Sequence, residues 1–281
     1  MPYKFLPNAF YRMPTHFGPT PGPRQLPGGR KADLKNNPKR LVATVNCLTD
    51  ESAIEALLPP KFSFPAGAQP VVTAEIQYLK EFDWLAGRGY NTLGVKMPAL
   101  YHGKSGDVPG TFLAVLWENL ADPILSGRDE LGFNKLWCEI DEPMVQAGRH
   151  RFSAGWLGHR FFEMEIWDLV AKEPNTAGTV LAGPPGNTGM LHYKYVPKTG
   201  KPGEVDAEYV TRTPAANPDV AVSERSDGNG SFRFIESRWE DMPTQGHVVN
   251  ALAALPCKKV LGASLVRSKG GKDFGDQEIV D

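Results

Sequence analysis

The sequence has no excess of charge of one sign and no long apolar run. Its 31 basic and 32 acidic residues leave a net charge of −1, so there is no electrostatic footprint for nucleic acid or for an anionic membrane surface. No run of about 18 apolar residues occurs, and the first 27 residues lack the apolar core of a secretion signal. We therefore expect a cytoplasmic protein whose partner is a small molecule or another copy of the chain.

Motifs for metals and cofactors are also missing. The three cysteines, Cys47, Cys138 and Cys257, lie far apart and show no paired spacing of a zinc site. The six histidines include no pair at helical ligand spacing, and no dinucleotide fingerprint is present. The glycine-rich residues 183–189 lack the Lys-Ser/Thr ending of a phosphate-binding loop, which favours a turn. We predict reduced cysteines and no metal or cofactor.

Proline and glycine are concentrated near the amino terminus. Residues 18–29 are rich in both, and such a stretch sustains neither a helix nor a central strand. We predict an arm over residues 1–37 and one domain over residues 38–281. The arm contains several aromatic residues, including Phe5, Phe10 and Phe17, which favours packing on its own body or on a neighbouring subunit over the alternative of disorder.

The rest of the chain consists mainly of short apolar segments separated by turn residues. Residues 162–166 alternate between apolar and acidic side chains, which is the period of a half-buried strand. Turns are predicted at 198–203 and 228–230. The segments interpreted as strands are 41–48, 71–79, 111–116, 135–140, 160–170, 190–196, 207–212, 231–239 and 259–266.

Only two segments have a helical pattern. Thr49 or Asp50 can cap a helix that stops at Pro59, and residues 243–255 carry apolar positions at helical spacing before Pro256. Many strands and two helices predict a mainly β or α+β domain built as a barrel or a sandwich.

One lysine has unusual neighbours in the sequence. If Lys135 begins a strand, Phe133, Lys135 and Trp137 share one face, so the amine would lie between two aromatic walls. A free lysine side chain has a pKa near ~10.4 and is charged at neutral pH, but loss of water favours the neutral amine. Neutral amines of this kind form imines with ketones. A surface lysine or a cation–π partner is the structural alternative.

The order of several motifs resembles the acetoacetate decarboxylase family over about residues 38 to 281. The co-linear set consists of Arg40, Thr49-Asp50 with the helix before Pro59-Pro60, Ala74-Glu75-Ile76, Gly127-Arg128-Asp129, Gly132-Phe133-Asn134-Lys135, residues 191–197, and Leu255-Pro256 with residues 260–266.

This resemblance implies a cone-like antiparallel β-barrel with a few peripheral helices, in a homo-oligomer of two, four or more subunits. It implies that Lys135 is the Schiff-base lysine, Arg40 an active-site arginine and Glu75 an active-site carboxylate. From the residues alone, Arg40 could equally belong to a strand edge or a salt bridge, and the polar face of residues 71–79 lines a cavity or faces solvent. Weaker candidates for lining the pocket are Tyr90, Thr92 and Trp117, of which Trp117 also suits structural packing.

Two positions depart from the family pattern. Leu136 stands where the family has a second lysine, and Thr92 stands where it has a glutamate. The resemblance therefore implies a Schiff-base-forming lyase for a small oxo acid, and it leaves open decarboxylation of a 3-oxo acid or aldol, dehydration or hydration chemistry on a 2-oxo acid. The alternative is a protein of the same fold that binds a small ligand without catalysis.

Overall fold

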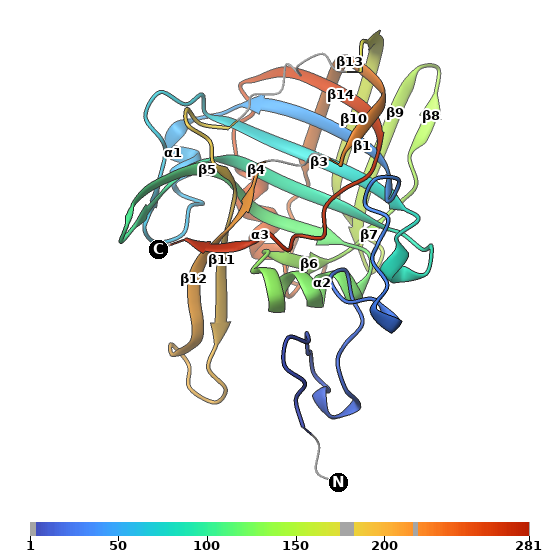
Figure 1. The fold of residues 1–281 in the computed structure, drawn as a ribbon. Coiled ribbons are helices and arrows are strands. Elements are labelled where there is room, and N and C mark those ends of the chain that lie inside the picture. The colour runs from blue at the N-terminus through green and yellow to red at the C-terminus, as the bar shows by residue number, and fades with distance from the viewer. Residues whose placement is uncertain (1–3, 175–182, 216–218, 281) are drawn as a thin grey trace.

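A computed structural model describes residues 4–174, 183–215 and 219–280 of the chain (Figure 1). Within these residues, 15 strands form one mixed sheet in the order β15-β12-β11-β5-β4-β3-β1-β14-β13-β10-β9-β7, with β2 on β4, β6 on β5 and β8 on β9. The strands are β1 Lys39–Leu48, β2 Phe62–Ser63, β3 Val71–Lys80, β4 Tyr90–Gly103, β5 Gly106–Glu118, β6 Lys135–Trp137, β7 Glu139–Ile140, β8 Met144–Gln146, β9 Arg149–Trp156, β10 His159–Lys172, β11 Gly189–Pro197, β12 Val205–Pro214, β13 Ala221–Phe234, β14 Lys259–Lys269 and β15 Glu278–Val280.

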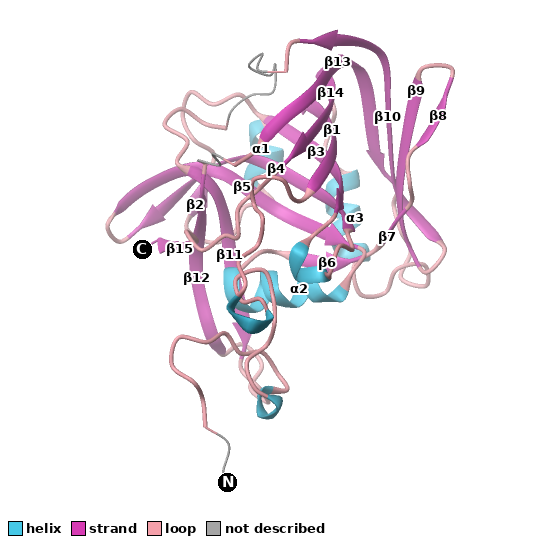
Figure 2. Ribbon diagram, turned by 45° about the vertical axis from the view of Figure 1, so that its right-hand side comes forward, coloured by secondary structure: helices cyan, strands magenta, loops and turns pink. Residues whose placement is uncertain are grey.

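Helices are few and short, as Figure 2 shows. They are α1 Glu51–Glu55, α2 Ala121–Ser126 and α3 Gly246–Ala253, with the single turns η1 Thr15–Phe17, η2 Pro27–Gly29, η3 Asp83–Leu85 and η4 Gly127–Leu131. The prediction of a mainly β domain with peripheral helices is confirmed. In the described part of the chain, every helix is too short or too polar to span a bilayer.

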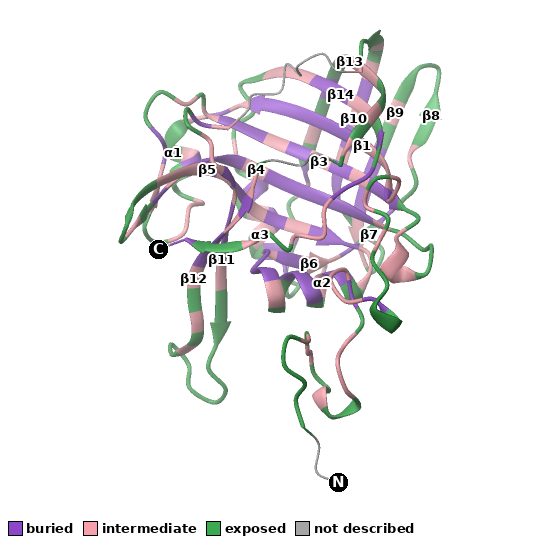
Figure 3. Cartoon of the chain, in the orientation of Figure 1, coloured by how far each residue is buried: buried purple, intermediate pink, exposed green. Residues whose placement is uncertain are grey.

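The two faces of the central strands have different roles. Along β3, Val72, Ala74 and Ile76 are fully buried in the apolar core. The alternate side chains Glu75 and Gln77 line a cavity on the other face. Burial of the central strands is visible in Figure 3. The polar face of β3 therefore lines a cavity and does not face bulk solvent.

Most predicted strands and both predicted helices are present. The strands β4 and β9, the short strands β2, β8 and β15 and the helix α2 were missed, and one turn prediction is wrong. Gly228 and Gly230 lie inside β13. A Cβ atom at Gly228 would lie 2.5 Å from the carbonyl oxygen of Trp167, and one at Gly230 would lie 2.7 Å from the Cβ atom of Ala263. These glycines permit close approach of neighbouring strands, so their clustering does not mark a hairpin. The predicted strand 231–239 corresponds to the last part of this longer strand, which ends at Phe234.

The described part of the arm packs on the protein's own body. Arg12 and Arg24 both pair with Glu130 of η4, and Arg24 also donates a hydrogen bond of 3.1 Å to the carbonyl oxygen of Asp273. Phe5 and Phe17 remain exposed. Near the predicted boundary, Leu34 accepts a hydrogen bond from the Gly271 amide and Asn37 donates one to Asp83. Polar contacts therefore hold the arm on the body, and the arm boundary at residue 37 stays a prediction.

The cysteine prediction is wrong at two positions. Cys47 in β1 and Cys257 form a disulfide with a Cα–Cα distance of 5.7 Å, although 210 residues separate them in sequence. The pairing of β1 with β14, which begins two residues after Cys257, brings them together. Sequence spacing could not show this contact. Cys138 is free and buried.

We expect the Cys257→Ser variant to lose about 2–4 kcal/mol of unfolding free energy under non-reducing conditions, because the bridge restricts the unfolded chain. Urea unfolding with and without reductant measures this. Wild type with reductant should match the variant, and a variant as stable as oxidised wild type would contradict the bridge.

Candidate active site

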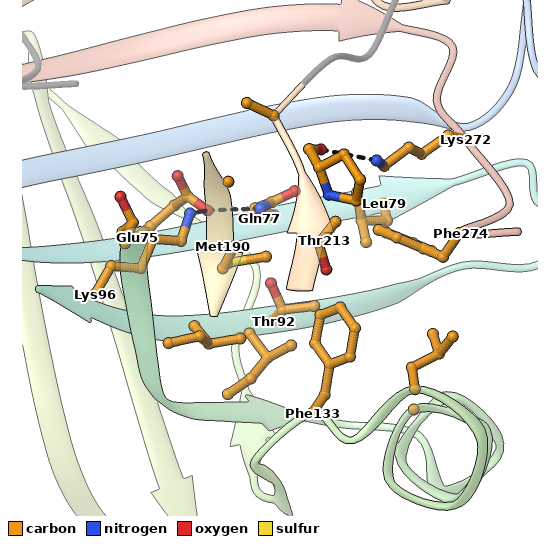
Figure 4. A pocket seen from close by; sticks show the side chains of 18 of the residues that line it. Glu75, Gln77, Leu79, Thr92, Lys96, Phe133, Met190, Thr213, Lys272 and Phe274 are labelled. Carbon is orange, nitrogen blue, oxygen red and sulfur yellow. Dashed lines mark hydrogen bonds and ion pairs between the residues drawn. The ribbon is translucent and has the colours of Figure 1, made fainter. Parts of the chain in front are cut away.

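A cavity of about 830 Å³ lies over the polar face of the central strands. Its wall includes Arg40 from β1, Glu75 from β3, Thr92 from β4, Glu118 from β5 and Lys135 from β6. Figure 4 shows Glu75, Gln77 and Lys96 grouped together, and Phe274 beside Lys272 at the opposite end of the view. Charged and aromatic side chains therefore both line the cavity.

Strand register explains why residues so far apart in sequence share this cavity. One row across the sheet pairs Glu75 with Gly94, Gly94 with Leu116, and Leu116 with Lys135. The next row pairs Gln77 with Thr92 and Thr92 with Glu118. Paired residues point to the same face of a sheet, so the side chains of Glu75 and Lys135 face the same cavity. Their backbones are separated by three strand spacings, or about 14 Å.

Lys135 is buried at the start of β6 and has only 7% of its surface exposed. Its Nζ atom lies 2.9 Å from Oε1 of Glu118 and donates a hydrogen bond of 2.9 Å to the carbonyl oxygen of Pro123. The ring of Phe133 lies 5.3 Å from the amine. The amine is thus fixed in position inside the protein by a carboxylate, a carbonyl and an aromatic ring.

The predicted aromatic surroundings of Lys135 are only half correct. Phe133 lines the cavity, but Trp137 is not among its lining residues. Glu118 takes the second place beside the amine, because the parallel pairing of β5 with β6 runs the end of β5 past Lys135. A charged partner therefore replaces one of the two expected apolar walls.

Glu118 is the residue of this site that sequence reasoning missed. It has 1% of its surface exposed, and its Oε2 atom is buried without a hydrogen-bond partner among the described residues. Burial raises the pKa of Glu118, although the charge and hydrogen bond of Lys135 act in the opposite direction. The sequence feature that could have indicated Glu118 is its position directly after the apolar segment 112–117.

Glu75 belongs to a separate charged group. Lys96 Nζ lies 2.6 Å from Oε1 of Glu75, and Gln77 donates to the same oxygen at 2.6 Å. Burial alone would raise the pKa of Glu75, but Lys96, Gln77 and the charge of Arg40 outweigh it and lower the pKa below its usual value. Glu75 is therefore a fixed negative charge.

Arg40 faces the cavity from the start of β1. Burial lowers the pKa of Arg40, while Tyr90 and Glu75 oppose the shift, and an arginine remains charged under such conditions. Its Nε atom is buried and has no hydrogen-bond partner in the described part of the chain. A buried, charged guanidinium with an unpaired donor is suited to an anionic ligand such as a carboxylate.

The three weaker candidates divide between the two faces of the sheet. Tyr90 and Thr92 line the cavity, and Tyr90 stacks on Phe82 with ring centroids 5.1 Å apart. Trp117 is fully buried on the other face of β5, where it donates a hydrogen bond of 2.7 Å to Gln245 and packs on Phe161. Among the described residues, the structure therefore gives Trp117 packing contacts and keeps it away from the cavity lining.

The fold and site define a mainly β protein with a buried lysine–carboxylate pair at a cavity. The family model described as acetoacetate decarboxylase matches residues 12–268, so the chain belongs to the acetoacetate decarboxylase family. The match begins inside the predicted arm. Membership of this family indicates an enzyme of the lyase type.

Solved structures show the same fold at low identity. Acetoacetate decarboxylase from Legionella pneumophila has a TM-score of 0.64 and 18% identity, covering 93% of this chain and 92% of that one. The enduracididine biosynthesis enzyme MppR, complexed with the condensation product of pyruvate and imidazole 4-carboxaldehyde, also has a TM-score of 0.64 and 18% identity, covering 99% and 98%. An acetoacetate decarboxylase-like enzyme from Sphingomonas wittichii has a TM-score of 0.60 and 16% identity, covering 84% and 92%. Among curated proteins, no sequence matches this chain.

These neighbours confirm the predicted fold. The sheet is not closed, which is compatible with the cone-like shape that the resemblance implied.

The position of the Lys135 amine depends on Gly127, the first residue of η4. A Cβ atom there would lie 2.4 Å from Cε and 2.6 Å from Nζ of Lys135. We expect Gly127→Ala to leave the fold intact, because the end of a flexible side chain can move, but to displace the amine. A displacement of about 1 Å can reduce a rate by ~10²-fold. Amine reactivity towards an oxo acid and thermal unfolding, measured together, test this, and a Gly127→Ala variant with unchanged reactivity would contradict the close packing.

Proposed function

We propose that this protein is a Schiff-base-forming lyase that acts on a small oxo acid, with Lys135 as the imine-forming residue. The observation that carries the proposal is the placement of the Lys135 amine, buried at a cavity wall and held 2.9 Å from both Glu118 and the Pro123 carbonyl. Membership of the acetoacetate decarboxylase family supports the same chemistry. In the proposed reaction, the neutral amine attacks the ketone carbon, and the protonated imine then accepts electrons from the adjacent bond to give an enamine.

Arg40 is proposed to bind the carboxylate of the oxo acid. Its guanidinium lines the cavity, and its buried Nε atom has no hydrogen-bond partner within residues 4–174, 183–215 and 219–280. A planar fork of donors suits a carboxylate. Glu75 keeps this side of the cavity polar through its pair with Lys96. Tyr90 and Thr92 line the same cavity as Arg40 and the amine.

The size of the cavity favours condensation over decarboxylation. Its volume of about 830 Å³ lies in the upper part of the ~300–1,000 Å³ range of ligand pockets, and a four-carbon oxo acid fills only a small part of it. A second reactant, such as an aldehyde, fits beside an enamine formed on Lys135. MppR, a structural neighbour, was solved with a condensation product of pyruvate and an aldehyde, so we propose aldol chemistry first and decarboxylation of a 3-oxo acid second.

The proposal includes assembly as a homo-oligomer. Large apolar side chains on the arm are exposed, among them Phe5, Met13 and Phe17, at 63%, 89% and 82%. A neighbouring copy of the chain would cover such a surface. Light scattering of the purified protein measures the number of subunits.

Borohydride reduction in the presence of pyruvate or acetoacetate tests the imine. We expect wild type to gain the mass of the reduced ligand on Lys135, and Lys135→Met to gain nothing. Lys80→Met is the matched control, because Lys80 is an exposed lysine at the end of β3 and its loss should leave labelling unchanged. A wild type that is never labelled would favour the alternative of a binding protein without catalysis.

Removal of the Arg40 guanidinium should weaken binding of oxo acids selectively. We expect Arg40→Met to raise the pyruvate concentration needed for half-maximal labelling by about 30-fold or more, in line with the ~2–5 kcal/mol cost of losing one partner of a buried charge pair. Labelling with acetone, which lacks a carboxylate, should hardly change. Equal losses for both ligands would show that Arg40 acts on the fold and not on the carboxylate.

The two reactions give different products. Incubation with acetoacetate releases carbon dioxide if the protein is a decarboxylase, whereas pyruvate with an aldehyde gives a condensed product if it is an aldolase. We expect the condensed product. Release of carbon dioxide without any condensed product would favour decarboxylation over aldol chemistry.

A further inference from the structure

The amine of Lys135 needs a proton acceptor before it can attack a ketone. Buried ammonium groups lose favourable hydration, and at this site Leu136 occupies the position after Lys135, so a second lysine does not stand there to repel the proton. Glu118 Oε1 lies 2.9 Å from Nζ, a distance at which a proton passes directly between the two atoms. Both side chains are almost completely buried, at 7% and 1% exposure.

We infer that Glu118 is the catalytic acid–base partner of Lys135, taking the proton of the lysine before imine formation and returning it to the departing water. This inference rests on the proposed function of Lys135. Burial raises the pKa of Glu118, so its carboxylate accepts a proton more readily than an exposed glutamate does. The hydrogen bond of the amine to Pro123 O holds Nζ in place in either state.

The proton balance closes within the site. The ammonium gives one proton to Glu118, and the amine lone pair forms the C–N bond while the carbonyl π electrons move to oxygen. A second proton moves from nitrogen to that oxygen. The Glu118 carboxylic acid then protonates the hydroxyl, the C–O bond breaks and water leaves. The protonated imine and the Glu118 carboxylate remain as a pair with the same total charge as at the start.

Three other titratable groups around this pair stay uncharged at neutral pH. Burial raises the pKa of Tyr90, on β4, well above its usual value, with Glu118 adding to the shift and Arg40 opposing it. Burial likewise raises the pKa of Cys138, which follows β6, well above its usual value. Burial and the charge of Lys135 lower the pKa of His192, on β11, to about 3. A charged neighbour is Arg128 of η4, which donates a hydrogen bond of 2.8 Å to the backbone oxygen of Lys135.

The test compares Glu118→Gln with wild type in the rate of pyruvate trapping on Lys135 between about pH 6 and pH 9. We expect wild type to react at a nearly constant rate, because the proton is exchanged inside the pair. Glu118→Gln should react about 10²-fold or more slowly near pH 7, the usual contribution of acid–base catalysis, and its rate should rise about tenfold per pH unit as bulk solvent deprotonates the amine. Glu142→Gln, at an exposed glutamate, is the control and should match wild type.

Each outcome has a distinct meaning. A Glu118→Gln protein that is labelled at the wild-type rate with the same pH profile would overturn the role of Glu118 and leave Lys135 as the imine-forming residue. A wild type that is never labelled would overturn the proposed function itself.

If Glu118→Gln does not fold, infrared difference spectroscopy of wild type decides the same point. Followed in time after addition of pyruvate, the spectrum should show a carboxylic acid band that appears before the imine, disappears when the protonated imine has formed, and shifts with glutamate ¹³C labelling. A Glu118 carboxylate that stays ionised throughout the reaction would overturn the inference.

Discussion

The site depends on one buried ion pair, between the amine of Lys135 and the carboxylate of Glu118. Removing two charges from water costs several kcal/mol per ion, and the contacts that offset this cost are few: the 2.9 Å approach between the two groups and the 2.9 Å hydrogen bond to Pro123 O. Transfer of one proton removes both charges. A pair of this kind is therefore reactive because of its burial, and the fold has to keep water away from it.

The sheet supplies that environment through its register. The parallel pairing of β6 with β5 sets Lys135 beside Leu116 and brings Glu118 within reach, while Gly127 leaves the room that the lysine side chain occupies. Phe133 covers the amine, and the ring of His192 stacks on Phe133 at 3.9 Å between centroids. The apolar side chains on the opposite face of the same strands form the core. The same strands therefore position both the site and the core.

Much of this arrangement could be predicted from the sequence, and the exceptions have physical reasons. Period-2 alternation located most strands, and the order of motifs correctly indicated the family. The candidate residues that do line one cavity are Arg40, Glu75, Tyr90, Thr92 and Lys135. Glu118 was missed because its partner lies 17 positions later in the chain and only the parallel β5–β6 pairing joins them. The Cys47–Cys257 bridge was missed for a similar reason, since antiparallel pairing of β1 with β14 creates a contact that spacing does not show.

The central claim is that the amine of Lys135 forms a covalent bond with an oxo acid inside this cavity. A crystal structure of the protein after reduction with pyruvate tests it most directly. The account predicts continuous electron density from Nζ of Lys135 to the second carbon of the ligand, with the ligand carboxylate at the Arg40 guanidinium and Glu118 still beside the nitrogen. Pyruvate bound without a bond to Lys135, or a Lys135 side chain turned out of the cavity into solvent, would contradict it.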